Sequence, residues 1–198
     1  MMNYKITVTK DHTSRSTSPR WDILPVAELT CTDDAITQPI FAQAVMCYRP
    51  QEGLHVRMWA FETDKAFCPE ESTLTAAFAP NPDKTEDYIL LQFSRKGITC
   101  AYTVVDGLQS EADPQGFALS LFSGEDLQGE YWGGSFAIPE GLFKARFGIS
   151  GFIGGKAVHG NLMHEGKAGG AYEYATLYPA KGDILSPADF GIFELIGY

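Results

Sequence analysis

The sequence has no apolar run long enough to cross a bilayer, and residues 1–10 lack the charged stretch and apolar core of a signal peptide. These absences predict a soluble protein of the cytoplasm. An extracellular location would require an export segment that is missing from this chain.

Positive charge is scarce as well. The chain has 15 lysines and arginines but 25 aspartates and glutamates, so its net charge is −10 at pH 7. Such an acidic surface repels the phosphates of nucleic acids and the headgroups of anionic lipids. We therefore expect neither nucleic acid nor membrane as a partner. The composition gives no indication of an oligomeric state.

Only four cysteines are present, and no two are spaced as in a zinc knuckle or a redox dithiol. Cys31, Cys47 and Cys100 lie in apolar segments, where a free thiol packs as a small hydrophobic side chain. The sequence leaves open whether all four are free. It also lacks a nucleophile elbow, a phosphate-binding loop and a metal-binding histidine pair. No motif therefore requires a cofactor.

What the chain has in quantity is short β-prone segments, separated by turn residues such as those at 50–53 and 80–83. This pattern predicts an all-β fold, an antiparallel β-sandwich of jelly-roll or immunoglobulin-like type, as a single domain over 1–198. One or two short helical turns are expected, including 139–145 behind Pro139. The predicted strands are 4–8, 27–32, 42–49, 54–62, 74–79, 88–94, 98–105, 117–122, 130–138, 157–164, 172–177 and 192–196.

The last segment carries a sharp local signal. Ser186 and Pro187 suit the N-cap and first position of a helical turn, and Asp189 completes a capping pattern three residues after Ser186. Gly191 is predicted to end that turn, because glycine accepts backbone angles that other residues resist. Residues 192–196 then form a final strand.

The predicted strand at 54–62 alternates strictly. Its even-numbered residues up to 60 are apolar, whereas Arg57 and Trp59 share the opposite face with His55 and Phe61. An aromatic ring beside a cation, opposite an apolar face, is typical of a ligand-binding sheet surface. The alternative is that Trp59 packs beneath a loop while Arg57 extends to solvent.

Weak motifs also follow one another in a definite order from Trp21 onward. They are Trp21, Pro25-Val26, Tyr48, Glu70-Glu71-Ser72, Pro80-Asn81-Pro82, Tyr88, Gln92-Phe93, Trp132, Asn161, Tyr178-Pro179 and the stretch from Pro187 to Gly191. Their order and spacing resemble the family 9 carbohydrate-binding modules and family-9-like relatives. The resemblance implies a sandwich of two antiparallel sheets, a sugar cleft closed by two tryptophans, and structural calcium.

The clamping tryptophans of that family have no counterpart here. Glu70 and Ile184 stand at the corresponding positions, and isoleucine has no flat aromatic face on which a sugar can stack. Two polar family positions fall near Ala76 and Ser94. Asn161 matches a family asparagine, which either binds ligand or closes a backbone turn.

We therefore predict a non-catalytic carbohydrate-binding-like domain that binds an unspecified saccharide without the family's clamp. The main alternative is a structural or protein-interaction β-sandwich that has lost sugar binding. Trp59 is the predicted platform, and the predicted polar partners of the sugar are Arg57, Glu62, Gln92, Asn161 and His164.

Other activities have weaker support in the sequence. An enzyme acting on carbohydrate would need two carboxylates at a set separation, and several acids lie close together in sequence from Glu62 to Glu71. Haem binding would use Met58 and Met163, although methionine is an ordinary core residue. Calcium would be held by oxygens of acidic turns, for which the candidates are Asp33, Asp34, Asp64 and Asp106.

Overall fold

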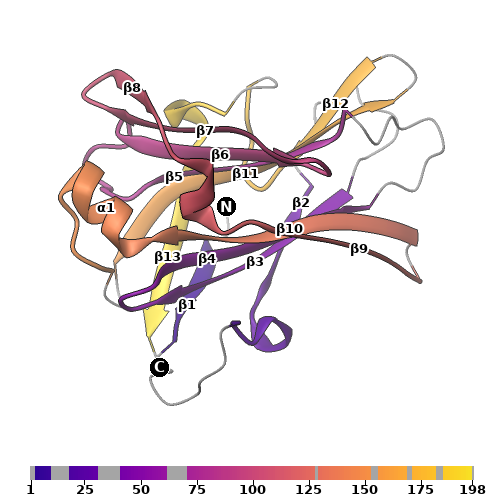
Figure 1. The fold of residues 1–198 in the computed structure, drawn as a ribbon, viewed down its shortest axis with the longest axis horizontal. Coiled ribbons are helices and arrows are strands. Elements are labelled where there is room, and N and C mark those ends of the chain that lie inside the picture. The colour runs from indigo at the N-terminus through magenta and orange to yellow at the C-terminus, as the bar shows by residue number, and fades with distance from the viewer. Residues whose placement is uncertain are drawn as a thin grey trace.

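The computed structural model describes residues 3–9, 18–30, 41–61, 71–127, 129–152, 156–168, 171–181 and 185–197. Figure 1 shows two packed layers of strands with α1 (Glu140–Phe147) at one end. The strands are β1 (Tyr4–Val8), β2 (Val26–Leu29), β3 (Phe41–Arg49), β4 (Gly53–Phe61), β5 (Thr73–Ala79), β6 (Tyr88–Ser94), β7 (Gly97–Val105), β8 (Leu108–Glu111), β9 (Ser120–Asp126), β10 (Gly129–Pro139), β11 (Ala157–Ala168), β12 (Ala171–Thr176) and β13 (Gly191–Gly197). Three single turns of 3-10 helix are η1 (Trp21–Ile23), η2 (Pro114–Phe117) and η3 (Pro187–Asp189).

One continuous, curled sheet makes both layers, in the order β8-β7-β6-β5-β11-β13-β1-β3-β4-β10-β9. We call β5, β6, β7, β8 and β11 the β6 layer, and β1, β3, β4, β9 and β10 the β4 layer; β13 joins them. The predicted β-sandwich is confirmed. The described pairings are antiparallel except those of β1, which runs parallel to β13 and β3. Neither neighbour of β1 is adjacent to it in sequence, so no hairpin imposes the antiparallel direction.

The core lies between the layers and follows the alternation of the strands. Leu54, Val56 and Met58 of β4 are buried there, as the pattern at 54–62 predicts. Trp132 of β10 is also buried, and the Phe93 ring of β6 meets it edge-on at 6.1 Å between centroids. Contacts of this kind between rings from the two layers fix the distance between the sheets.

The region before β9 differs from the prediction. Strand β8 was not predicted, and β9 begins at Ser120 rather than at 117. Asp113 caps η2 by accepting a hydrogen bond from the Gln115 amide at 3.0 Å, with Pro114 at the first position. This cap draws Phe117 into a helical turn, where its ring is buried. The local capping residues therefore outweigh the β propensity of the segment.

The C-terminal turn is confirmed, but the reason predicted for its glycine is wrong. The Ser186 hydroxyl and amide both donate to Asp189 Oδ2, at 2.7 and 3.1 Å. Gly191 does not have the left-handed backbone angle that the prediction assumed. A Cβ there would lie 2.4 Å from the Tyr178 ring, so glycine is required for the close approach of that ring.

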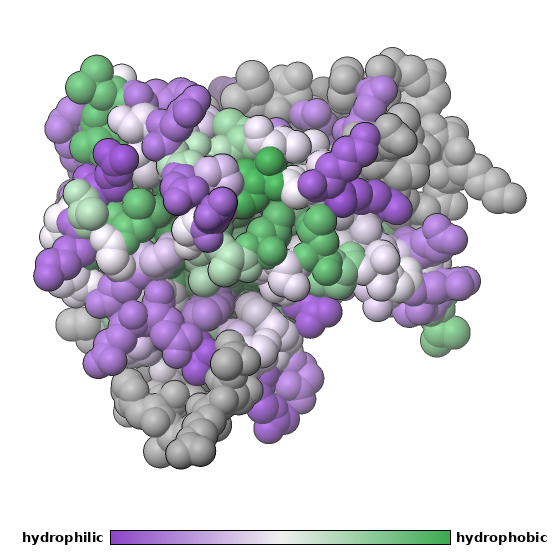
Figure 2. Space-filling view, viewed as in Figure 1, coloured by the Kyte–Doolittle hydropathy of each residue, from purple (hydrophilic) through white to green (hydrophobic). Residues whose placement is uncertain are grey.

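The molecular surface is mostly polar around an apolar centre on one face. Figure 2 shows hydrophobic side chains in the middle of that face, surrounded by hydrophilic ones. Within the described residues no helix is both long and apolar enough to cross a membrane, since α1, the longest, has eight residues.

Candidate functional site

The predicted platform lies on the outward side of the β4 layer, where four strands contribute side chains. Trp59 is opposite Gln43 of β3 and Gly133 of β10, and Gly133 is opposite Phe122 of β9. In the next row, Arg57 is opposite Val45 and Ser135, and Ser135 is opposite Ser120. We call this surface the β4 outer face, defined by Gln43, Val45, Arg57, Trp59, Ser120, Phe122, Gly133 and Ser135.

Arg57 and Phe122 form the closest contact between a cation and a ring on this face. The guanidinium carbon of Arg57 lies over the Phe122 ring, 4.2 Å from its centroid. Gly133 provides the space, because a Cβ there would lie 2.8 Å from Phe122 Cζ and 2.1 Å from the Met58 carbonyl oxygen. The ring can therefore lie against the sheet, and it holds the cation in place.

Phe122 and Gly133 were missed by the sequence reasoning. Phe122 was assigned to a predicted strand ending at 122, where no alternating pattern indicated which face it would occupy. The cross-strand register places both residues beside Arg57 and Trp59, and register depends on tertiary pairing. A glycine flanked by Trp132 and Gly134 gave only a weak signal of close backbone approach.

Trp59 is half-buried rather than fully open. It packs with Trp21 against a small cluster formed by Leu24, Val45 and Cys47, separate from the main core. The segment containing η1 supplies Trp21 and Leu24, and Figure 1 shows this short coil outside the β4 layer. Part of the Trp59 ring is thus fixed by packing, which orients the part that stays accessible.

Further rings continue the β4 outer face toward the start of β10. Phe41 and Phe61 stack at 5.4 Å between centroids, and Tyr131 lies 5.8 Å from Phe61. Tyr131 in turn meets Phe122 at 6.5 Å. Phe61 itself is buried, whereas Phe41, Tyr131 and Phe122 are half-buried. The aromatic surface therefore extends across β3, β4, β10 and β9.

Gln92 lies elsewhere, on the outward side of the β6 layer. Its amide donates to Thr75 Oγ1 at 3.2 Å and accepts from Thr99 Oγ1 at 3.1 Å. The two outer faces are on opposite sides of the sandwich, so one small ligand cannot contact both Gln92 and Arg57 (Figure 1). A role for Gln92 in binding sugar stays a prediction.

Asn161 is fully buried in β11 and bonds to backbone groups of two other segments. Its Nδ2 donates to the carbonyl oxygens of Tyr178 and Asp189, both at 2.9 Å. Its Oδ1 accepts from the amides of Leu162 and Tyr178, at 2.9 and 3.0 Å. The sequence left open whether Asn161 binds ligand or closes a backbone turn. In the structure its side chain joins β11 to the C-terminal turn, as in the second of these roles.

His164 is also fully buried, and its Nε2 lies 3.0 Å from the hydroxyl oxygen of Ser72. Among the described residues, its Nδ1 has no hydrogen-bond partner. Burial lowers the pKa of His164 to about 3, because the charged imidazolium would lose its hydration. Glu62, the remaining predicted site residue, lies outside the described residues. Of the five candidates that the structure describes, only Arg57 and Trp59 lie together, on β4.

The positions corresponding to the family's clamp, Glu70 and Ile184, also lie outside the described residues. Ala76 belongs to the main core, and Ser94 is buried with its hydroxyl accepting from the Lys96 amide at 3.2 Å. Neither side chain is available to a sugar on the surface.

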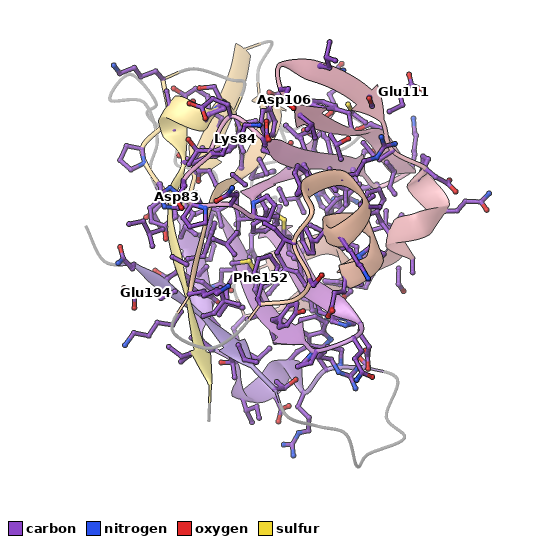
Figure 3. The ribbon with its side chains drawn as sticks, turned by 90° about the vertical axis from the view of Figure 1, so that its left-hand side faces the viewer. Asp83, Lys84, Asp106, Glu111, Phe152 and Glu194 are labelled. Atoms are coloured by element: carbon purple, nitrogen blue, oxygen red, sulfur yellow. The ribbon has the colours of Figure 1, made fainter. Side chains whose placement is uncertain are left out.

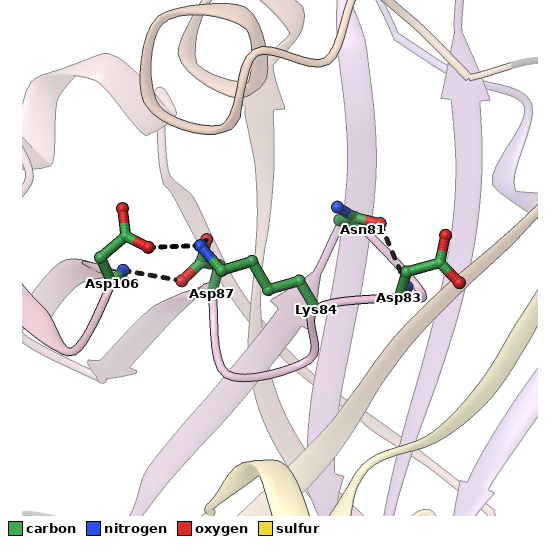
Figure 4. Close-up of polar contacts among 5 residues, drawn as sticks. All are labelled: Asn81, Asp83, Lys84, Asp87 and Asp106. Atoms are coloured by element: carbon green, nitrogen blue, oxygen red, sulfur yellow. Dashed lines mark hydrogen bonds and ion pairs between the residues drawn. The ribbon is translucent and has the colours of Figure 1, made fainter.

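Of the four calcium candidates, only Asp106 is described. Figures 3 and 4 show it beside Lys84, whose Nζ lies 2.6 Å from carboxylate oxygens of both Asp106 and Asp87. The Asp106 amide also donates to Asp87, at 2.8 Å. The two carboxylates raise the pKa of Lys84, so the ammonium occupies the place that a metal cation would take.

No group of three or more histidine, cysteine, aspartate or glutamate side chains suited to a metal ion occurs in the described part of the chain. Both haem candidates are buried. Met58 lies in the main core, and Met163 lies in a cluster with Ala77, Leu90 and Leu185. The free thiols of Cys47 and Cys100 are described, whereas Cys31 and Cys68 are outside those ranges.

No protein-family model and no curated protein matches the sequence. Solved structures do match the fold. A family 9 carbohydrate-binding module from Caldicellulosiruptor kristjanssonii, in complex with glucose, has a TM-score of 0.62 and 8% identity over the whole chain and 97% of that module. The structure with cellotriose has a TM-score of 0.63 and 8% identity, covering 100% of this chain and 95% of that one.

A proposed carbohydrate-binding protein from Bacteroides uniformis ATCC 8492 has a TM-score of 0.65 and 14% identity, over 98% of this chain and 100% of that protein. At these identities the likeness concerns the fold. The family-9-like sandwich that the order of motifs predicts is confirmed at that level.

Proposed function

We propose that this protein is a non-catalytic carbohydrate-binding domain that holds a saccharide on the β4 outer face. The observation that carries the proposal is the Arg57 guanidinium over the Phe122 ring, beside a half-exposed Trp59 on the same face. The two family 9 structures with this fold contain glucose and cellotriose, which supports a saccharide as the ligand class.

The chemistry of the face suits a pyranose ring. The accessible part of Trp59 offers apolar surface to the C–H face of a sugar, while Arg57, held over Phe122, offers hydrogen-bond donors to its oxygens. Gln43 and Ser135, opposite Trp59 and Arg57, add amide and hydroxyl groups. Stacking and hydrogen bonding break no covalent bond, so the proposal assigns no catalytic residue.

Replacing Trp59 with Ala is expected to weaken saccharide binding about 10-fold, because it removes the aromatic surface on which the sugar stacks. Isothermal titration with the strongest hit from a glycan array measures the effect. Tyr102→Ala is the matched control, since Tyr102 is a half-buried aromatic residue packed on the outward side of the β6 layer. It should leave affinity unchanged.

Two results would contradict the proposal. If Tyr102→Ala or Gln92→Ala abolished binding while Trp59→Ala did not, the ligand would bind on the β6 layer instead. If no glycan produced heat at millimolar concentration, saccharide binding itself would be wrong. Thermal melts of each variant separate loss of a contact from loss of folding.

A structural or protein-interaction sandwich is the second candidate, favoured by one observation. Trp59 shares its packing cluster with Trp21 and Leu24 from the η1 segment, so part of its ring stabilises a local contact. For this candidate, Trp59→Ala would lower the melting temperature and the wild-type protein would bind no glycan. The same titrations and melts therefore distinguish the two functions.

A further inference from the structure

We infer that the saccharide bound on the β4 outer face carries a carboxylate, as a uronic acid does, and that Arg57 binds this group. The inference rests on the proposed function and specifies its ligand class. It follows from the contacts of Arg57, a half-buried residue whose guanidinium carbon lies 4.2 Å from the centroid of the Phe122 ring. Within the described residues, the Arg57 guanidinium makes no hydrogen bond and no ion pair, although it has five N–H donors.

Two other described arginines pair with carboxylates. Acidic residues outnumber basic ones by 25 to 15, so carboxylate partners are abundant. Arg49 pairs with Glu52 at 2.9 Å, and the exposed Arg20 pairs with Asp22 at 3.0 Å. Arg57 contacts an aromatic ring instead, which orients the cation but supplies no acceptor.

The described side chains in the same cross-strand row as Arg57 carry no charge. The side chains directly opposite it are Val45 and Ser135, and Ser120 follows in the same row. Adjacent positions in such a row are about 5 Å apart, within reach of one sugar ring. Glu28 of β2 lies opposite Gln43 of β3. Because β2 is two strands away from β4, Glu28 lies roughly 10 Å from β4. The row therefore presents one cation and two hydroxyls.

A uronic acid matches this arrangement better than a neutral sugar. Its carboxylate is planar and can accept two parallel N–H bonds from one guanidinium, a geometry that a hydroxyl cannot reproduce. Its pyranose ring keeps an apolar face for the accessible part of Trp59. The ring contact fixes Arg57 before the ligand arrives, so less conformational entropy is lost on binding.

The test uses a panel of uronic-acid oligosaccharides, containing galacturonate, glucuronate or mannuronate, each paired with its neutral methyl ester. Titration calorimetry of the whole 198-residue chain is expected to show at least one acid that binds about 10- to 100-fold more tightly than its ester. Arg57→Gln should remove that preference, because it weakens binding of the acid far more than binding of the ester. Arg57→Lys should restore part of it, because the charge remains but the planar fork is lost.

Arg146→Gln is the matched control, since Arg146 is an exposed arginine at the end of α1 and should not affect the preference. Equal affinity for acid and ester in the wild-type protein would overturn this inference and leave saccharide binding in place. Retention of the acid preference in a folded Arg57→Gln variant would also overturn it. No binding to any acid, ester or neutral glycan at millimolar concentration would overturn the proposed function as well.

Discussion

Replacing Asn161 with Ala is expected to lower the free energy of unfolding by about 3–5 kcal/mol and the melting temperature by roughly 10 °C. Asn161 is fully buried and makes four hydrogen bonds of 2.9–3.0 Å to backbone groups. Alanine would leave amides and carbonyls of Tyr178, Asp189 and Leu162 without this partner. Buried backbone groups that lose their partners cost more than the net value of each bond.

Urea denaturation measures the effect, and Asn81→Ala is its control. The Asn81 side chain accepts one hydrogen bond, at 3.1 Å, from the exposed Asp83 amide. Asn81→Ala should therefore lower the free energy of unfolding by only about 0.5 kcal/mol. If Asn161→Ala lowered the free energy of unfolding no more than Asn81→Ala does, the hydrogen bonds from Asn161 to the backbone would contribute little to stability. A variant that kept its stability but lost saccharide affinity would assign Asn161 to the ligand, the other role open from the sequence.

Acidification from pH 6.5 to pH 4.5 is expected to lower the free energy of unfolding by about 2–3 kcal/mol, mainly through His164. The unfolded chain binds a proton at His164 near pH 6.5, whereas burial lowers the folded-state pKa to about 3. Over this interval the unfolded state holds more protons, so stability is present at neutral pH and falls as the pH drops. The free energy of unfolding stops falling only when the pH is below the folded-state pKa of His164.

Urea denaturation at half-unit pH steps tests this expectation. His164→Gln should flatten most of the dependence, because glutamine does not titrate and can still bond to Ser72. His55 contributes in the same direction, since partial burial also lowers its pKa. An unchanged slope in His164→Gln would contradict the assignment to His164.

Local signals in the sequence were reliable where the interactions are themselves local. The Ser186 and Asp189 capping contacts span three residues, and they form as predicted. The alternation in β4 likewise identified which of its side chains enter the core. Both cases depend on backbone geometry within one element, which short-range spacing encodes.

Contacts between distant segments were predicted less well. The pairing of β9 with β10 places Phe122 beside Arg57, and no spacing in the sequence specifies that register. Gly191 was assigned to the right turn for the wrong reason, because the ring that excludes its side chain belongs to Tyr178. The residues predicted as one site were likewise separated, with Gln92 and Arg57 on opposite outer faces.

The sequence by itself determined the β-sandwich, the C-terminal turn and the outward orientation of Arg57 and Trp59. Strand periodicity and turn residues indicate where each element lies and which of its side chains point outward. The order of motifs indicates how the elements follow one another along the chain. Only the tertiary structure decided what surrounds those two side chains. Sheet pairing brought Phe122 under Arg57, the η1 segment covered part of Trp59, and the fold placed no described acceptor at the guanidinium. Ligand recognition depends on such contacts across strands, and these form only when the sheet assembles.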